Sequence, residues 1–308
     1  MQIVTGTKHY DRQKFSTIRD IIRDCAERFA DADAYRYHET PGSADTVRSY
    51  KDFNDDINTC GTALLDLGLQ GKHIVIVGAN SYEWAVAHNA VVNGTGVSVP
   101  LDRQLPEQEV ISLSDRGQAE AFIYNAPHHE IALKVAESNR RIRYFICMKP
   151  DVISQTLQQE DPRFISWETL MERGRHLLAS GDRSFIDAQI DPEALCALLF
   201  TSGTTALSKG VMLCHRNIAS NVHAVTSTLE IKQNQRALSV LPLHHTFENT
   251  VGMYGLLSYG CCICFTDGLR YFVQNLKDWQ INIIIGVPLL FDNIYKQNVR
   301  RKYVNSKW

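Results

Sequence analysis

A loop of hydroxyl and glycine residues, with a single lysine, lies between two apolar runs in the second half of the sequence. The stretch reads LLFTSGTTALSKGVMLCHRN and extends from Leu198 to Asn217. A turn rich in glycine and hydroxyls presents several backbone N–H groups to one point, and such a nest binds anions, phosphate above all. The lysine, Lys209, adds a mobile full charge that can follow a phosphate through a reaction. The pattern predicts a loop that binds a polyphosphate.

The residues expected to hold the polyphosphate carry a short hydroxyl, a positive charge or no side chain at all. They are Thr201, Ser202, Gly203, Thr204, Thr205, Lys209 and Gly210. The alternative is a plain polar hairpin turn. A short turn rarely needs ten residues that include five Ser or Thr and a lysine, so we favour the binding loop.

The NTPase P-loop, G-x-x-x-x-G-K-S/T, is a different phosphate loop and does not fit. Gly203 and Lys209 have its spacing, but Ser208 stands at its second glycine and Gly210 at its magnesium-binding hydroxyl. An apolar run of strand type follows the loop directly, where the P-loop requires a helix. We therefore reject the P-loop.

Composition and charge restrict the class of protein. The chain has 308 residues, 44% of them hydrophobic and 21% charged, and a net charge of -2. No basic stripe with interleaved aromatics is present, which argues against a nucleic-acid partner. No apolar segment of signal type follows Met1, so we expect a cytoplasmic protein. The late apolar run INIIIGVPLL is too short and interrupted to cross a bilayer, so we expect membrane contact to be peripheral at most.

The eight cysteines mostly stand singly inside apolar segments. Cys261 and Cys264 have CxxC spacing, which could indicate zinc or redox chemistry, but they lie in the strand-like run GCCICFTDG without a second ligand pair. We therefore interpret the cysteines as small buried residues in a reducing compartment and assign no metal ligands.

Apolar runs of strand length alternate with helical patterns along most of the chain. The strand candidates include residues 73–77, 96–100, 121–125 and 142–147, and they are apolar throughout. Such strands, separated by helices, predict a mainly parallel sheet covered on both faces. Residues 149–192 are more polar, with one short helix expected near Trp167. We predict a first α/β subdomain over 1–192 and a second, truncated one over 193–308 that carries the phosphate-binding loop.

Polar residues predict where several helices begin. Thr17 with Asp20, and Ser49 with Asp52, have capping-box spacing, and Asn217 could cap a helix after the loop. Pro288 stands where the last helix could begin.

The segment TSGTTALSKGVMLCHRN resembles the signature loop of the adenylate-forming, AMP-binding superfamily, which includes acyl-CoA synthetases, peptide adenylation domains and luciferases. The family pattern is Thr-Ser-Gly-Thr-Thr-Gly-x-Pro-Lys-Gly-Val, followed by a His-Arg/Lys-Asn segment. Ala206 and Ser208 replace the usual glycine and proline. We interpret these changes as the mark of a subfamily.

The resemblance covers residues 16–300, and LPLHHTFE looks like the next family motif in its long-chain fatty-acid form. It implies an α/β fold of layered, mainly parallel sheets flanked by helices, namely the large N-terminal domain of an acyl-CoA synthetase, incomplete at its C-terminus. It also implies a two-step reaction. A fatty-acid carboxylate attacks ATP, assisted by Mg²⁺, to give an acyl-adenylate, and the thiol of coenzyme A or a carrier protein then takes the acyl group.

The resemblance assigns roles to particular residues. Lys209 and the loop would hold the phosphates, and His245 would position the carboxylate or gate the thiol path. His244 is expected to be a packing residue. Glu248 is either functional or a partner of a helix dipole. The segment GMYGLLSYG either lines the acyl pocket or belongs to the core.

Other family motifs, among them a magnesium-binding acid and a catalytic lysine, would follow residue 308. We therefore expect this chain by itself to bind pyrophosphate-like anions weakly and to complete neither half-reaction well. Two alternatives stay open: a non-catalytic binding or interaction module derived from such a ligase, and an enzyme that adenylates aryl or amino acids.

Overall fold

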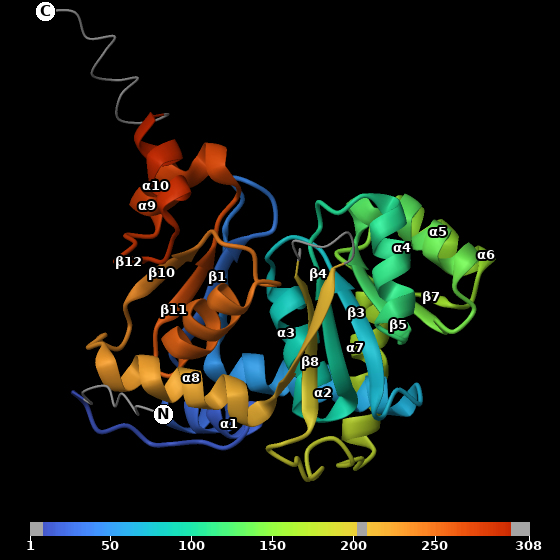
Figure 1. The fold of residues 1–308 in the computed structure, drawn as a ribbon, viewed down its shortest axis with the longest axis horizontal. Coiled ribbons are helices and arrows are strands. Elements are labelled where there is room, and N and C mark those ends of the chain that lie inside the picture. The colour runs from blue at the N-terminus through green and yellow to red at the C-terminus, as the bar shows by residue number, and fades with distance from the viewer. Residues whose placement is uncertain (1–8, 202–207, 297–308) are drawn as a thin grey trace, which may run out of the picture.

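The computed structural model describes residues 9–201 and 208–296. Their strands form two sheets that lie side by side (Figure 1). In sheet order, the seven-stranded sheet consists of β7 (Phe164–Ser166), β6 (Tyr144–Met148), β5 (Ala119–Asn125), β3 (Lys72–Val77), β4 (Gly96–Leu101), β8 (Leu195–Thr201) and β9 (Lys209–Cys214). The five-stranded sheet consists of β12 (Ile283–Ile284), β10 (Arg236–Ser239), β11 (Cys262–Phe265), β1 (Asp33–His38) and β2 (Asp45–Ser49).

Helices cover both sheets. They are α1 (Ile18–Arg28), α2 (Tyr50–Asp66), α3 (Tyr82–Ala90), α4 (Glu107–Arg116), α5 (His129–Ser138), α6 (Val152–Glu160), α7 (Trp167–Ala179), α8 (His215–Thr228), α9 (Phe272–Asp278) and α10 (Pro288–Ile294). Short helices are η1 (Val91–Thr95), η2 (Ala126–His128), η3 (Glu248–Gly255) and η4 (Leu269–Tyr271), of which η1 and η3 are π-helices. None of the described helices is long and apolar enough to cross a membrane.

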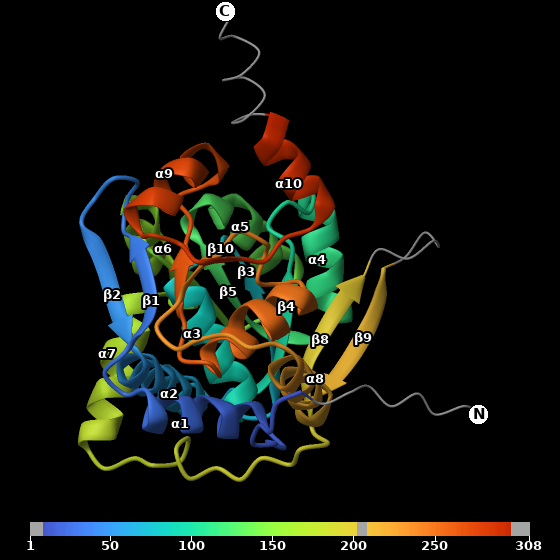
Figure 2. The same cartoon turned by 90° about the vertical axis from the view of Figure 1, so that its left-hand side faces the viewer.

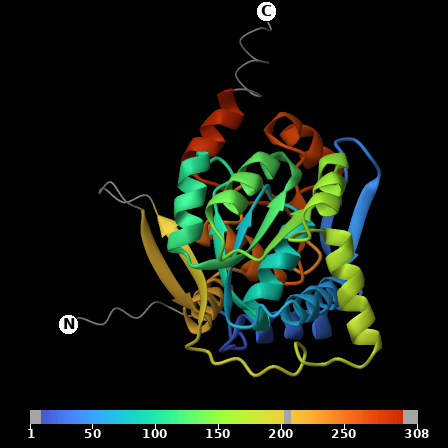
Figure 3. The ribbon, with the colours of Figure 1, turned by 90° about the vertical axis from the view of Figure 1, so that its right-hand side faces the viewer.

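The alternation of side chains along each strand explains the layers. In β3, Ile74 and Ile76 face the central core between the sheets, whereas Val75 and Val77 face the outer core under α4 and α5 (Figure 3, green helices). Since both faces are buried, the strand is apolar at every position. The predicted class, mainly parallel sheets flanked by helices, is confirmed.

Helix α3 lies between the two sheets, and eight of its nine residues are buried (Figure 1). A helix that is buried on all sides is apolar on all sides, as the run of Trp84, Ala85, Val86 and Ala87 shows. Any polar residue on such a helix must find a partner inside the protein.

Two strand pairs are antiparallel. The β1–β2 pair forms a hairpin at one edge of the five-stranded sheet, and β8–β9 projects as the edge hairpin of the other (Figure 2). The sequence reading did not identify β1 or β2. Their pattern is obscured by charged residues that pair with one another, such as Arg36 with Asp33 and Asp45.

The region 149–192 contains more structure than the single helix expected. A further helix, α6, precedes the helix at Trp167. Its apolar pattern is weak because Val152 and Ile153 are exposed, and Asp151 caps it by accepting the N–H of Ser154 at 3.0 Å. The division at residue 192 stays a prediction; each sheet takes strands from both sides of it.

Two of the proposed caps are confirmed and one is wrong. Thr17 Oγ1 accepts the N–H of Asp20 at 3.1 Å, and Ser49 and Asp52 form the reciprocal capping box. Helix α8 begins at His215, before Asn217, because the Asn217 side chain accepts the N–H of Cys214 from inside the first turn.

Arg19 is buried and ties α1 to two other segments. Its guanidinium donates to the carbonyl oxygens of Asn93 and Phe185, and to that of Ala188 at 2.6 Å. It also lies 5.0 Å from the centre of the Phe185 ring. Burial lowers its pKa to about 10, yet the carbonyl oxygens solvate the charge that water no longer reaches.

We expect Arg19→Leu to lower the free energy of unfolding by about 3 kcal/mol, because several buried carbonyls lose their donor. Urea unfolding measures this loss. Arg140→Leu, at an exposed position, serves as the matched control and should change stability little. Equal effects of the two substitutions would contradict this role for Arg19.

Candidate functional site

The segments that follow four parallel strands meet in one cavity of about 370 Å³. Two of the strands belong to each sheet, so the cavity lies where the carboxyl ends of both sheets converge. In open α/β sheets, ligands bind in this position. The lining residues are Gly78, Ala79 and Asn80 after β3; Asp102, Arg103 and Gln104 after β4; Ser239, Val240, Pro242, His244 and His245 from β10 onward; and Thr266, Asp267 and Gly268 after β11.

A second cavity, of about 470 Å³, lies between α4 and the β8–β9 hairpin. Thr201 and Ser208, the described residues on either side of 202–207 in the predicted loop, both line it. His244, His245 and Asp102 line both cavities. The turn that contains His244 and His245, here called the histidine turn, therefore forms part of the wall of both cavities.

The predicted loop residues divide into three groups. Thr201 ends β8 and pairs in antiparallel register with Lys209, the first residue of β9. Lys209 and Gly210 are exposed on the hairpin and do not line the cavity. The other four, Ser202, Gly203, Thr204 and Thr205, lie outside the described residues. The structure thus brings Thr201 and His245 to one cavity, and the roles of all these residues stay predictions.

Ser208, which stands where the family pattern has proline, is bonded to α4. Its hydroxyl donates to Glu109 Oε1 at 3.2 Å, and its carbonyl accepts from Arg116 Nη2 at 2.6 Å. Arg116 also lies 5.4 Å from the centre of the Phe200 ring on β8. A proline has no hydroxyl to make the first of these bonds. Serine at this position therefore forms a hydrogen bond to Glu109 that the family's usual proline could not form.

His244 and His245 differ in environment although they are neighbours. His245 is exposed, and its ring centre lies 4.2 Å from that of His244. Burial and the neighbouring imidazole lower the pKa of His244 to about 4, so its ring is neutral at pH 7. Its Nε2 lies 3.8 Å from Asp102 Oδ2. His244 was expected only to pack, yet it also lines both cavities.

Buried polar residues connect the histidine turn to the seven-stranded sheet. His88 on α3 contacts Ser98 Oγ on β4 at 2.9 Å and the Asn249 amide at 3.2 Å. The same amide donates to the carbonyl oxygen of Leu243 at 3.4 Å. Burial lowers the pKa of His88 to about 3, so it acts as a neutral link. The sequence analysis did not predict this series of hydrogen bonds. A histidine such as His88 within an apolar helix is the signal that could have indicated it.

His215, from the His-Arg-Asn segment, is a structural residue. It is buried, and its Nδ1 accepts the N–H of Ile18 at 3.3 Å, which joins the start of α8 to the start of α1. Burial lowers its pKa to about 4, as the accepting, neutral form requires.

Glu248 is a buried acid at the first position of η3, only 2% exposed. Ser239 Oγ donates to its Oε1 at 2.6 Å, and Oε2 has no hydrogen-bond partner among the described residues. A Cβ at Gly252 would lie 2.5 Å from Oε2, so glycine leaves room for the carboxyl group. Burial raises the pKa of Glu248 to about 7. Since Ser239 lines the junction cavity, Glu248 lies directly behind its wall.

An apolar groove of about 400 Å³ begins at Phe247, two residues after His245. Gly255, Leu256 and Tyr259 of the segment GMYGLLSYG line it, whereas Met253 belongs to the central core. This segment therefore contributes both to an apolar groove and to the core, and its role in an acyl pocket stays a prediction. The groove is lined by Val225, Leu229, Ile231, Phe247, Val251, Gly255, Leu256, Tyr259, Ile283, Ile284, Ile285, Gly286 and Phe291.

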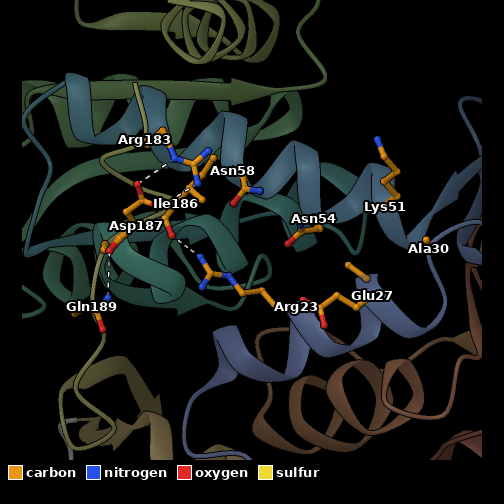
Figure 4. A pocket seen from close by; sticks show the side chains of 12 residues that line it. Arg23, Glu27, Ala30, Lys51, Asn54, Asn58, Arg183, Ile186, Asp187 and Gln189 are labelled. Carbon is orange, nitrogen blue, oxygen red and sulfur yellow. Dashed lines mark hydrogen bonds and ion pairs between the residues drawn. The ribbon is translucent and has the colours of Figure 1, made fainter. Parts of the chain in front are cut away.

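A larger cavity, about 640 Å³, lies elsewhere, between α1, α2 and residues 183–189 (Figure 4). Most of its charged side chains have partners. Arg183 pairs with Asp187 at 3.1 Å, Lys51 pairs with Asp55 at 2.8 Å, and Arg23 donates to a backbone carbonyl. None of the sequence-predicted site residues lines it, so we place the candidate site at the histidine turn.

The raised pKa of Glu248 predicts that the stability of the protein depends on pH. The folded-state pKa of Glu248, about 7, lies above the ordinary value of 4.5, so Glu248 costs stability as the pH rises through this window. We expect Glu248→Gln to be more stable than the wild type at pH 8, by about 3 kcal/mol, with the difference shrinking toward pH 4.5. Urea unfolding across this pH range measures the difference.

Glu130→Gln, at an exposed position on α5, is the control and should give a difference from the wild type that does not vary with pH. A constant difference for Glu248→Gln as well would show that Glu248 ionises normally.

Known proteins with similar sequences belong to the family that the hydroxyl-rich loop resembles. A family model described as AMP-binding enzyme matches residues 22–307. A chloroplastic long-chain-fatty-acid–acyl-carrier-protein ligase of Arabidopsis thaliana is 27% identical over 293 residues, 92% of this chain and 39% of that protein. Human long-chain-fatty-acid–CoA ligase ACSBG2 is 24% identical, over 91% of this chain and 42% of its own length. The chain thus spans about two fifths of these relatives.

Solved structures agree in fold. The N-terminal domain of FACL13 from Mycobacterium tuberculosis has a TM-score of 0.75 at 21% identity, over 94% of this chain and 66% of that one. The adenylation domain of a carboxylate reductase from Mycobacterium chelonae has a TM-score of 0.80 at 18% identity, over 95% of this chain and 49% of that one. The family model covers nearly the whole sequence, including the hydroxyl-rich loop and the histidine turn. The chain belongs to the AMP-binding enzyme family.

Proposed function

We propose that this chain carries the fatty-acid- and phosphate-binding part of an AMP-forming fatty-acid ligase. In the whole protein, the fatty-acid carboxylate would attack the α-phosphorus of ATP. A new O–P bond forms as the bond to pyrophosphate breaks, which gives the acyl-adenylate. A thiol, from coenzyme A or a carrier protein, would then attack the acyl carbonyl carbon, lose its proton and expel AMP.

One observation supports this proposal above the others. The turn that contains His245 faces the cavity at the hydroxyl-rich loop, and two residues later Phe247 lines the apolar groove. A ligand with an acidic head and a long apolar tail fits these two neighbouring spaces. The named activities of the relatives, which are long-chain fatty-acid ligases, agree with it.

The residues of the chain would act mainly by positioning. Lys209 and the loop would stabilise the phosphate charge and the leaving pyrophosphate. His245 would orient the carboxylate, while neutral His244 could exchange hydrogen bonds without adding charge. The space at the junction of the sheets would admit the thiol. The described residues contain no group of three or more His, Cys, Asp or Glu side chains able to hold a metal ion. Mg²⁺ would enter bound to the phosphates of ATP, as a partner of the substrate.

We expect Lys209→Gln to weaken pyrophosphate binding about tenfold, because one charge-assisted hydrogen bond is lost. Isothermal titration calorimetry measures the affinity. Lys51→Gln, in the separate cavity of Figure 4, is the matched control and should bind pyrophosphate like the wild type. If both variants retained wild-type affinity, the loop would not be the phosphate site.

We expect Val251→Trp to fill the apolar groove and weaken palmitate binding about tenfold or more, while hexanoate still binds. Displacement of a fluorescent fatty acid measures both affinities. Val152→Trp, at a side chain 77% exposed on α6, is the control. Benzoate or phenylalanine binding in preference to palmitate would instead support an aryl- or amino-acid enzyme, and no binding of any acid would favour the non-catalytic module.

A further inference from the structure

Asn80 joins the two sheets at the candidate site. It follows β3 of the seven-stranded sheet, yet its hydrogen bonds go to the segment after β10 of the five-stranded sheet. Its Nδ2 donates to the carbonyl oxygen of Leu241 at 2.7 Å, and its Oδ1 accepts the N–H of Leu243 at 2.9 Å. A third bond runs from Nδ2 to Ser239 Oγ at 3.1 Å.

The side-chain amide takes the place of a neighbouring strand. A primary amide offers a donor and an acceptor side by side, as a backbone peptide group does. Between parallel strands, one residue's carbonyl and the N–H two residues later bond to the same residue of the adjacent strand. Leu241 and Leu243 are bonded in this way to Asn80. Since β10 ends at Ser239, the Asn80 amide extends the ordered backbone beyond the last ladder pair.

The histidine turn begins within the segment 241–243, which is hydrogen-bonded to Asn80. The N–H of His245 donates to the carbonyl oxygen of Pro242 at 3.0 Å, and the carbonyl of His245 accepts from the Asn249 N–H at 3.0 Å. The imidazole of His245 makes no hydrogen bond to the described residues, and its recorded ring contact is with His244. The backbone therefore determines where the His245 ring lies.

From these contacts we infer that Asn80 is a positioning residue for His245: its amide fixes the backbone at Leu241 and Leu243 and thereby holds the ring between the two cavities. The consequence for ligand binding rests on the proposed function, but the position of the ring can be tested independently of it. Asn54→Ala, in the separate cavity of Figure 4, offers a matched control, since it removes the same side-chain amide away from the histidine turn.

The test uses the full chain with ¹⁵N-labelled histidine and compares ring resonances at pH 7. Variants that replace His244 and His245 by Gln assign the two signals. In Asn80→Ala we expect the ring signals of His244 and His245 to shift, while those of His38 and His129 stay in place. Asn80→Asp keeps the acceptor for the Leu243 N–H and loses the donor to Leu241, so it should give smaller shifts of the same two signals. It also provides the test if Asn80→Ala does not fold.

The binding measurement separates the two proposals. If wild-type protein binds palmitate, we expect about tenfold weaker binding in Asn80→Ala, with pyrophosphate binding retained and Asn54→Ala close to the wild type. If the wild type binds neither ligand, the proposed function fails, and the ring signals alone decide the role of Asn80. Unchanged signals of His244 and His245, or shifts spread evenly over all folded histidines, would overturn the inference.

Discussion

The contact between the two sheets is the constraint on which the candidate site depends. Its cavity is lined by residues that follow strands of both sheets, so no single sheet contains it. Helix α3 fills the space between them and is buried nearly all round. The polar residues there, such as His88 and Asn249, cannot reach water and bond to each other across the interface. The same bonds that satisfy the interior also hold the histidine turn.

This buried layer also determines the charge of the site. Burial keeps His88 and His244 neutral at pH 7 and favours the protonated form of Glu248. A buried environment of low dielectric constant strengthens whatever electrostatic contact a ligand makes there. The acids that line the cavity between α4 and the β8–β9 hairpin are Asp102 and Glu109, of which Glu109 accepts a hydrogen bond from Ser208. A phosphate bound near Thr201 would therefore depend on donors from the loop.

The two π-helices lie at this interface. One, η1, follows α3 directly, and the other, η3, begins at Glu248 immediately after the histidine turn. Local widening of a helix is frequent at functional sites, because it changes which side chains face a cavity. Here η3 directs Met253 into the central core while Val251 lines the apolar groove. One short segment thus serves both the packing of the sheets and the wall of a binding space.

The sequence by itself determined the features whose signal is local. The alternation of apolar runs predicted the parallel strands, and the spacing of hydroxyls, glycine and Lys209 predicted a phosphate loop. The motif around His245 predicted the second part of the site, and the functional roles of the loop and of His245 stay predictions. Tertiary structure alone decided the β1–β2 hairpin, the sharing of both sheets between the two halves of the chain, and the contacts of Asn80 and Glu248. The hydrogen-bond partners of Asn80 are more than 150 residues away along the chain. The raised pKa of Glu248 depends on its burial. Neither long-range pairing nor burial at an interface leaves a periodic pattern in the sequence, because each is a property of the assembled sheets.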